Sequence, residues 1–321
     1  MKSDSIDVAP GVTLDLIDLP LPLEGYHHFF GIWLLRDENR GLRAIVDTGP
    51  SSTVPVLLES LKKHGVTRLD YILLTHIHLD HSGGLAEVLK AFPTARVAVH
   101  PKGRRHLCNP ERLWQSSLEV IPDMAAVYAE PAPVDEKVFL PEPPGVPGVE
   151  AIDTPGHAPH HRSFVYRAGE KTILFAGEAA STYGRRGHAY PGEDDGTFFL
   201  RPATPPKFFF GDALESIARL EEVDADIMCY AHFGYTREAP HLLKEARQQL
   251  LLWKDLFMEY LAEKKAASEE VKIEDLLDYV LGKDPWLAEL ANLPEDMQHR
   301  ERGFLLSSAA GFLGAVRGSD I

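Results

Sequence analysis

From about residue 11 to residue 47, short runs rich in apolar residues are separated by polar and turn residues, which is the pattern of β-strands. This pattern predicts three strands, over residues 12–17, 29–35 and 43–47. The polar run from Asp37 to Gly41 separates the last two and predicts a turn. The chain is therefore expected to begin as a sheet.

From residue 52 the apolar spacing changes to three and four residues, which predicts a helix. Helices and strands then alternate, and after a long gap they resume in a similar order. Helices are expected over residues 52–64, 82–92 and 212–222, and strands over 68–74, 96–100, 149–152, 163–167, 171–176 and 226–230. Ser82 is a good N-cap for the second helix. Two similar halves of strands and helices result.

Two stretches interrupt this order. Residues 102–147 are rich in proline and residues 181–210 are loose, and few clear elements stand out in either. Long irregular connections in a compact domain are usually lids or binding loops. We expect that role for both stretches.

After Gly234 the chain becomes helical, with apolar stripes at spacings of three and four residues. The stripes run over residues 243–260, 273–281 and 297–316. We therefore divide the chain into a domain of residues 1–235 and a helical region of residues 236–321. The stripes fit packing onto the main domain. A homodimer through these helices is the alternative, because the last one is rich in small residues.

The composition of the chain limits the compartment and the substrate class that we expect. The chain has 321 residues, enough to bury a core without disulfides, and its two cysteines, Cys108 and Cys229, stand far apart. No apolar run approaches the roughly 18 residues of a membrane span, so we expect a cytoplasmic protein without membrane contact. The net charge of −15 repels phosphate backbones, so we expect a small-molecule substrate and no nucleic acid.

The most informative chemistry directly follows the apolar strand at 68–74. The segment THIHLDH, residues 75–81, places three imidazoles and one carboxylate within six positions. These are the ligands that zinc prefers. His76 and His78 face the same way in an extended strand end and can share a metal, whereas Asp80 and His81 face a neighbouring position. The spacing suggests two adjacent metal sites.

A metal needs about four ligands, and further candidates follow at the ends of later strands, in DTPGHAPHH, FAGE and AHFG. Together with THIHLDHSGG, and in this order, these motifs resemble the metallo-beta-lactamase superfamily, whose signature is HxHxDH, and in particular its glyoxalase II and lactonase-like branch. The motifs span residues 47–234. The resemblance implies an α/β fold, a four-layered αββα sandwich of two mixed β-sheets, here with a helical C-terminal extension.

The resemblance also assigns roles to single residues. It implies two sets of metal ligands and one bridging acid: His76, His78 and His157 for the first metal, Asp80, His81 and His232 for the second, and Glu178 between them. Asp47 matches an acid that supports the ligand histidines by hydrogen bonds. Asp80 is also the expected catalytic residue, which orients a metal-bound hydroxide and carries its proton.

Glu178 departs from the family pattern, because the bridging acid is normally aspartate. One more methylene changes the reach of the carboxylate, so the second site could be weaker, shifted or empty. Two zinc ions per chain are favoured, and a single metal, or iron or manganese, stays open. His160 stands where relatives often have glycine, and the sequence allows either a place near the metals or a partly exposed loop.

The implied activity is hydrolysis of a small ester, thioester or lactone. Two alternatives are a mononuclear iron dioxygenase acting on persulfides and a metal-binding protein without turnover. Polar candidates for binding the substrate follow Glu178 in the second loose stretch: Tyr183, Arg185, Arg186, His188 and Tyr190. These side chains could bind a carboxylate or phosphate, or they could form a solvated loop.

Overall fold

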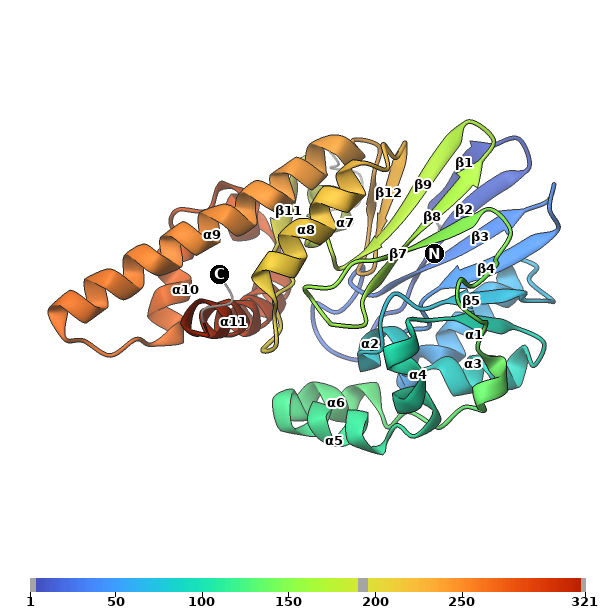
Figure 1. The fold of residues 1–321 in the computed structure, drawn as a ribbon, viewed down its shortest axis with the longest axis horizontal. Helices are drawn as coiled ribbons and strands as arrows, with labels where there is room; N and C mark the ends of the chain where they lie inside the picture. The colour runs from blue at the N-terminus through green and yellow to red at the C-terminus, as the bar shows by residue number, and fades with distance from the viewer. Residues whose placement is uncertain (1–3, 190–195, 319–321) are drawn as a thin grey trace.

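The computed structural model describes residues 4–189 and 196–318. Two mixed β-sheets lie face to face, and helices cover their outer sides (Figure 1). The predicted four-layered αββα sandwich is therefore confirmed. Tyr190, one of the candidates for substrate binding, lies outside the described residues.

The first sheet has the strand order β1-β2-β3-β4-β5-β6. Its strands are Asp4–Ala9 (β1), Val12–Asp18 (β2), Gly31–Asp37 (β3), Leu42–Val46 (β4), Tyr71–Leu73 (β5) and Arg96–Ala98 (β6). Strands β1 to β4 pair antiparallel, and β4, β5 and β6 pair parallel. The first strand, β1, was not expected from the sequence.

The second sheet has the order β13-β12-β9-β8-β7. Its strands are Val149–Asp153 (β7), Arg162–Ala168 (β8), Lys171–Gly177 (β9), Ile227–Tyr230 (β12) and Tyr235–Thr236 (β13). Among the described strands of this sheet, β9 and β12 pair parallel and the other neighbours pair antiparallel. A separate two-stranded sheet joins Thr182–Arg185 (β10) and Phe198–Arg201 (β11).

Helices follow both sheets. Those associated with the first half are Val54–Lys63 (α1), Leu79–Ser82 (α2), Leu85–Ala91 (α3), Pro101–Cys108 (α4), Glu111–Val120 (α5) and Pro122–Tyr128 (α6). Those of the second half are Arg186–Ala189 (α7), Phe210–Glu221 (α8), Ala239–Ala267 (α9), Ile273–Leu281 (α10) and Glu295–Arg317 (α11), with short 3-10 helices at Ser51–Thr53 (η1), Glu136–Val138 (η2) and Pro285–Asn292 (η3).

Side chains on the two faces of a strand pack into different layers of the sandwich. In β9, Ile173 and Phe175 pack between the two sheets, whereas Leu174 and Ala176 pack toward the helices on the outer side. Successive side chains of a strand point to opposite faces, so a strand that is buried on both faces is continuously apolar. The indole Nε1 of Trp33 in β3 also donates to the carbonyl of Tyr230 in β12 at 2.9 Å, which links the two sheets.

The expectation of few elements in residues 102–147 is wrong, because α4, α5 and α6 occupy much of this stretch. Pro101 and Pro122 are the first residues of α4 and α6, and Pro110 precedes α5. Proline fits the first turn of a helix because the amide that it lacks would have no partner there. These prolines start helices, whereas the sequence interpretation took them as signs of irregular structure. The second stretch, 181–210, likewise holds β10, α7 and β11.

The predicted N-cap at Ser82 is also wrong. A separate turn of helix, α2, begins at Leu79, and the next helix, α3, has Gly84 at its N-cap. The Ser82 hydroxyl donates to the carbonyl of His78 at 3.2 Å instead. The tight turn comes directly after the strand, and it holds both Asp80 and His81.

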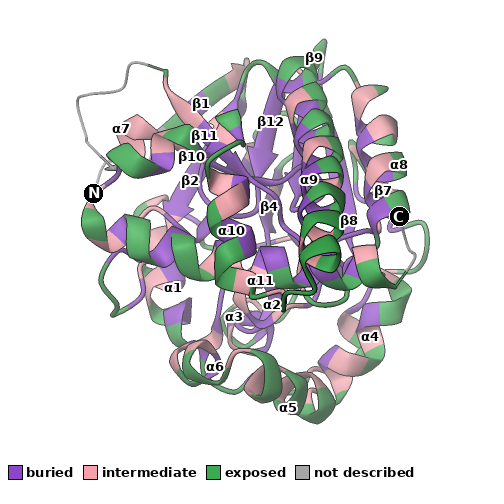
Figure 2. Cartoon of the chain, turned by 90° about the vertical axis from the view of Figure 1, so that its left-hand side faces the viewer, coloured by how far each residue is buried: buried purple, intermediate pink, exposed green. Residues whose placement is uncertain are grey.

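The C-terminal helices lie against the second sheet and α8. One cluster of buried side chains runs from β9 and β12 through α8 and α9 to α11, with Trp253, Phe257 and Phe312 among its largest members. Figure 2 shows exposed residues on the outer face of α9 and buried strands behind it. Among the described residues, no helix is long and apolar enough to cross a membrane.

Candidate metal centre

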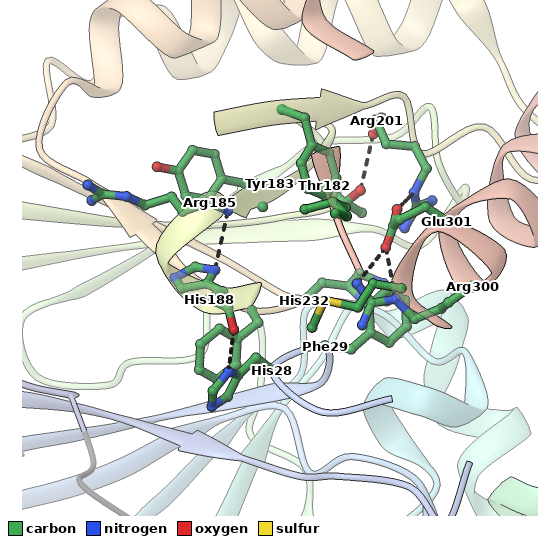
Figure 3. Close-up of a pocket in the computed structure, with 15 residues that line it drawn as sticks. His28, Phe29, Thr182, Tyr183, Arg185, His188, Arg201, His232, Arg300 and Glu301 are labelled. Atoms are coloured by element: carbon green, nitrogen blue, oxygen red, sulfur yellow. Dashed lines mark hydrogen bonds and ion pairs between the residues drawn. The ribbon is translucent and has the colours of Figure 1, made fainter. Parts of the chain in front are cut away.

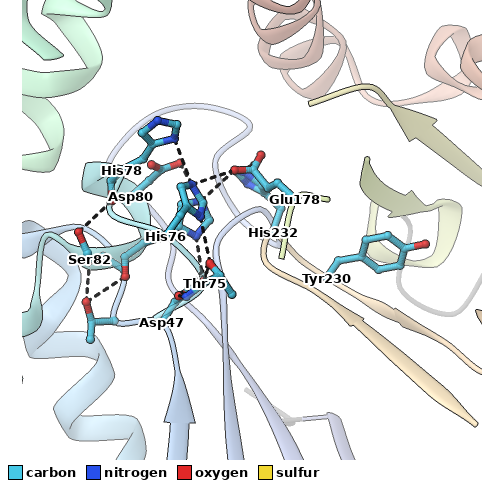
Figure 4. Close-up of polar contacts among 12 residues, drawn as sticks. Asp47, Thr75, His76, His78, Asp80, Ser82, Glu178, Tyr230 and His232 are labelled. Carbon is cyan, nitrogen blue, oxygen red and sulfur yellow. Dashed lines mark hydrogen bonds and ion pairs between the residues drawn. The ribbon is translucent and has the colours of Figure 1, made fainter. Parts of the chain in front are cut away.

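Residues that follow four strands meet at one edge of the sandwich. The segment 76–81 follows β5, His157 follows β7, Glu178 follows β9 and His232 follows β12. Figure 4 shows His76, Glu178 and His232 directed toward one another. All seven ligands expected from the sequence are thus brought together by the fold.

Their potential ligand atoms form two groups. One group is His76, His78, His157 and Glu178, and the other is Asp80, His81 and His232. Within each group the atoms lie within 4.8 Å of one another. The division is the one that the resemblance implied, except that Glu178, expected between the two sets, is counted in the first group.

Two glycines allow the tight turn that carries Asp80 and His81. A Cβ atom on Gly83 would lie 2.4 Å from the carbonyl of Leu79, and one on Gly84 would lie 2.4 Å from a methyl of Val54. No real Cβ atom tolerates such distances. The sequence Gly83-Gly84 is therefore required for the backbone to pack this closely.

Asp47 orients the ring of His81. Its carboxylate accepts the backbone N–H of Thr75 at 2.8 Å, the hydroxyl of Thr75 at 2.8 Å and Nδ1 of His81 at 3.1 Å. Because a carboxylate only accepts, Nδ1 of His81 carries the proton. Nε2 then faces the cluster, where it is buried and finds no hydrogen-bond partner among the described residues. A metal ion would satisfy this nitrogen.

The hydrogen bonds of the first group direct its nitrogens in the same way. The hydroxyl proton of Thr75 goes to Asp47, so its oxygen accepts from Nδ1 of His76 at 3.0 Å. Nδ1 of His157 donates to the carbonyl of Ala203 at 3.0 Å. The Nε2 atoms of His76 and His157 therefore face inward, each 3.0 Å from Nδ1 of His78.

Three nitrogens at this spacing fit a common cation. Ligands in a tetrahedron with bonds of about 2.0–2.1 Å lie about 3.3 Å from one another. Burial lowers the pKa of His76 well below its usual value, and it lowers the pKa of His78 to about 4. Both rings are therefore neutral near pH 7, which is the state that binds a metal. The donor set fits a divalent ion of the zinc type.

The second group differs in its charges. Burial alone would lower the pKa of His81, but the carboxylates of Asp80, Asp47 and Glu178 raise it well above the usual value. Burial would raise the pKa of Asp80, and the charge of His81 outweighs it and brings the pKa to about 2. Asp80 is therefore ionised at neutral pH. It is an anionic ligand atom beside a ring whose proton a metal would replace.

Glu178 lies between the two groups. Its Oε2 is 3.0 Å from Nε2 of His157, 3.3 Å from Nε2 of His76 and 3.3 Å from Nε2 of His81. Its Oε1 is 3.1 Å from Nε2 of His232. Burial would raise the pKa of this carboxyl, but His157 and His232 hold it well below its usual range. The longer side chain therefore reaches both groups.

The backbone of Glu178 is fixed by His161. The N–H of Glu178 donates to Nε2 of His161 at 2.9 Å, so Nδ1 of this ring carries the proton and donates to Thr154 Oγ1 at 2.8 Å. That hydroxyl lies 3.0 Å from Ser163 Oγ, which donates to the carbonyl of Ala176 at 2.9 Å. His161 is thus a positioning residue. The sequence showed it only as the neighbour of His160.

The residues proposed for substrate binding have different surroundings. Tyr183 is buried and stacks on Tyr230, with ring centroids 4.9 Å apart. Arg185 lies in a pocket beside His232, whereas a guanidinium nitrogen of Arg186 lies 3.5 Å from Glu289 in η3. His160 is partly buried, and its ring centroid is 6.4 Å from that of His76. Tyr183 and His188 line the same pocket as Arg185, and His160 lies near a ligand of the first group.

Sequence interpretation missed a tyrosine of α6. Tyr128 is buried, and its ring centroid is 5.7 Å from that of Phe30, which itself is 5.4 Å from the ring of His232. Burial raises the pKa of the Tyr128 hydroxyl well above its usual value, and the charges of Asp80 and Glu178 raise it further. The hydroxyl is therefore neutral. Because α6 itself was not expected, no signal pointed to this residue.

Residues 32–232 match the sequence model of the metallo-beta-lactamase superfamily. The chain belongs to this superfamily. It is 28% identical over 223 residues to a metallo-beta-lactamase fold-containing protein of Sulfurisphaera tokodaii, a match that covers 65% of this chain and 75% of the relative. It is 27% identical over 136 residues to a hydroxyacylglutathione hydrolase of Saccharophagus degradans, covering 42% of each chain.

Solved structures of the superfamily have the same fold. An archaeal metallo-beta-lactamase superfamily protein from Sulfolobus tokodaii has a TM-score of 0.61 and 23% identity, with 93% of this chain and 97% of that chain covered. A metallo-beta-lactamase family protein from Thermus thermophilus has a TM-score of 0.61 and 21% identity, covering 98% and 95%. These structural matches cover nearly the whole chain, so they include the C-terminal helices.

Proposed function

We propose that this superfamily member is a metal-dependent hydrolase that cleaves a small ester, thioester or lactone, with Asp80 as the catalytic residue. The observation that carries the proposal is the place of Glu178, whose Oε2 lies 3.0–3.3 Å from nitrogens of both ligand groups. A carboxylate in this place can bridge two cations. The name of several relatives, hydroxyacylglutathione hydrolase, denotes hydrolysis of a thioester and supports an acyl substrate.

We assign a different chemical role to each group of residues. The first metal would be held by His76, His78 and His157, the second by Asp80, His81 and His232, with Glu178 between them. Bound metal ions lower the pKa of a water molecule and polarise the substrate carbonyl. The Asp80 carboxylate, ionised at neutral pH, can accept a proton from the attacking water and orient it. Asp47 keeps the ring of His81 in the orientation that binding requires.

Metal content and turnover test this proposal together. We expect two zinc ions per chain by elemental analysis of the purified protein, and hydrolysis of at least one member of a panel of esters, thioesters and lactones. Full metal content without turnover on any member would contradict the proposal. One iron per chain together with oxygen uptake would favour the alternative of a mononuclear dioxygenase.

The variant Glu178→Gln tests the bridge itself. An amide lacks the charge that balances two cations, so we expect the zinc content to fall from two toward one and turnover to fall by at least about tenfold, as for other groups that support metal sites. Glu150→Gln is the matched control, because Glu150 is 59% exposed and pairs only loosely with Arg167, at 3.6 Å. Equal zinc content in the two variants would contradict the bridging role.

A further inference from the structure

A pocket opens beside His232, and none of its described lining residues belongs to the first ligand group. The β10–β11 hairpin, the loop at residues 28–29 and helix α11 form its walls (Figure 3). Arg201, the last residue of β11, and the neighbours Arg300 and Glu301 of α11 line it. The pocket therefore joins a candidate metal ligand to charged residues of the C-terminal region.

Two buried arginines meet at one glutamate in this pocket. Nε of Arg201 lies 2.9 Å from Oε2 of Glu301, and Nη2 of Arg300 lies 2.8 Å from Oε1 of the same carboxylate. All three side chains are at most 5% exposed. Two guanidinium groups thus share one carboxylate. A guanidinium donor that is held away from water is unfavourable unless an acceptor pairs with it.

The unused hydrogen-bond donors belong to Arg201. Arg300 uses Nε and Nη2 for Glu301 and donates Nη1 to the carbonyls of Gly25 and His27, and its charge also acts on Asp18. Arg201 instead donates only through Nε, and its two Nη groups have no acceptor among the described residues. Its guanidinium also stacks on Phe304, 4.9 Å from the ring centroid. The guanidinium of Arg201 is therefore held in one orientation, and its Nη groups can still donate hydrogen bonds.

The strand end that carries Arg201 is held rigidly. Gln249 of α9 donates to the carbonyl of Leu200 at 2.8 Å, and Ser308 of α11 donates to the carbonyl of Pro202 at 2.7 Å. The ring of Phe29, which packs 4.7 Å from His232, forms an apolar wall of the same pocket. A preoriented guanidinium that is shielded from water binds anions more strongly than one in water.

We propose that Arg201 binds an anionic group of the substrate, a carboxylate or a phosphate, while the scissile carbonyl lies at the metal centre beyond His232. The planar guanidinium offers two parallel N–H donors, the geometry that carboxylates and phosphates accept. The substrate of the proposed hydrolase is thus an anionic acyl compound. This inference rests on the proposed function for the reaction that the substrate undergoes. It rests on the pocket for the negative charge of the substrate.

Binding tests the anion site without turnover. Metal-loaded protein is titrated calorimetrically with glutarate, with inorganic phosphate and with neutral glutaramide. We expect at least one anion to bind and glutaramide not to, and Arg201→Gln to weaken the anion by roughly 10- to 100-fold, the value of a charged hydrogen bond. Glu301 keeps Arg300 as its partner in this variant, so the fold is retained. The control is Arg167→Gln, at an arginine that is 56% exposed.

Turnover gives the second measurement. We compare two aryl esters of similar length, one with a terminal carboxylate and one with a terminal methyl group. The wild type is expected to favour the charged ester by roughly 10- to 100-fold in kcat/KM, mainly through KM. Arg201→Gln should lose this preference, mainly through a higher KM for the charged ester.

The two proposals fail in different ways. If Arg201→Gln binds glutarate and phosphate as tightly as the wild type does, or if neither anion binds, the anion site is wrong, whatever the esters show. Anion binding that depends on Arg201, combined with no hydrolysis of any ester, would support the pocket and contradict the hydrolase. A metal-bound anion would be insensitive to Arg201→Gln, so this variant separates the two modes of binding.

Discussion

At the scale of single residues, hydrogen bonds decide which nitrogen of each histidine faces the metal centre. Asp47 fixes His81, Thr75 fixes His76, and the carbonyl of Ala203 fixes His157. Each of these acceptors takes up one ring nitrogen and directs the other nitrogen inward. The ligands are thus oriented before any metal binds, which lowers the entropy cost of binding.

Glu178 is oriented through its backbone, and this arrangement requires the glycine before it. Gly177 has φ +64°, and a Cβ atom there would lie 2.4 Å from Nε2 of His161. We expect Gly177→Ala to displace His161 and to weaken zinc binding by about 10- to 100-fold, as loss of such support does elsewhere. Competition with a chromogenic chelator measures the affinity.

Gly169→Ala is the matched control for this change. Gly169 has φ +65°, but nothing lies within 4 Å of a Cβ placed there. Both variants should lose about 1–2 kcal/mol of unfolding free energy from the left-handed backbone, and only Gly177→Ala should also lose zinc affinity. Equal zinc affinity in the two variants would show that contact with His161 does not position Glu178.

At the scale of elements, helix α11 fixes the segment that supports the metal centre. A Cβ on Gly311 would lie 2.2 Å from the carbonyl oxygens of both Thr204 and Pro205. The hydroxyl of Thr204 donates to the carbonyl of Ser308 at 2.7 Å. The neighbouring Ala203 accepts from His157. A small residue of α11 thus serves packing within the chain, and a homodimer through these helices stays a prediction.

The variant Gly311→Ala tests this close approach. We expect it to reduce the free energy of unfolding by about 1–3 kcal/mol, the usual cost of overpacking, as measured by urea denaturation. Gly303→Ala lies on the same helix at an exposed position with nothing within 4 Å. It should instead stabilise the protein by about 0.5–1 kcal/mol, because alanine favours helix more than glycine does. Stabilisation by both variants would rule out the contact.

At the scale of the whole molecule, three clusters of buried side chains fill the space between the four layers. None of the candidate metal ligands belongs to these clusters. The hydrophobic core is therefore complete without the metal, in contrast to small zinc domains that fold only around their ion.

Removal of metal should therefore separate activity from folding. We expect a chelator to abolish hydrolysis and to leave the far-ultraviolet circular dichroism spectrum unchanged. The melting temperature should fall by a few degrees, because a ligand that binds only the folded state stabilises it. Unfolding on chelation at room temperature would mean that the metal holds the layers together.

The sequence by itself determined most elements and all candidate ligands. Strands buried on one or both faces and helices with one apolar stripe have local periods, so β3, β9 and α10 could be predicted. The segment 75–81 was informative because its residue types have few other reasons to occur together. Single prolines were not informative, because Pro101 and Pro122 start helices where a break was expected.

Only the tertiary structure decided how these parts act together. Arg201 and Glu301 are 100 residues apart in the chain, and the carbonyl of Ala203 meets a ring 46 residues before it. Nothing local marks such pairs, because the contacts exist only once β11 and α11 have packed on the second sheet. The reach of Glu178 to both ligand groups was likewise set by the turn at Gly177 and by His161. Residue types and spacing thus indicated the ligands, and long-range packing fixed their geometry.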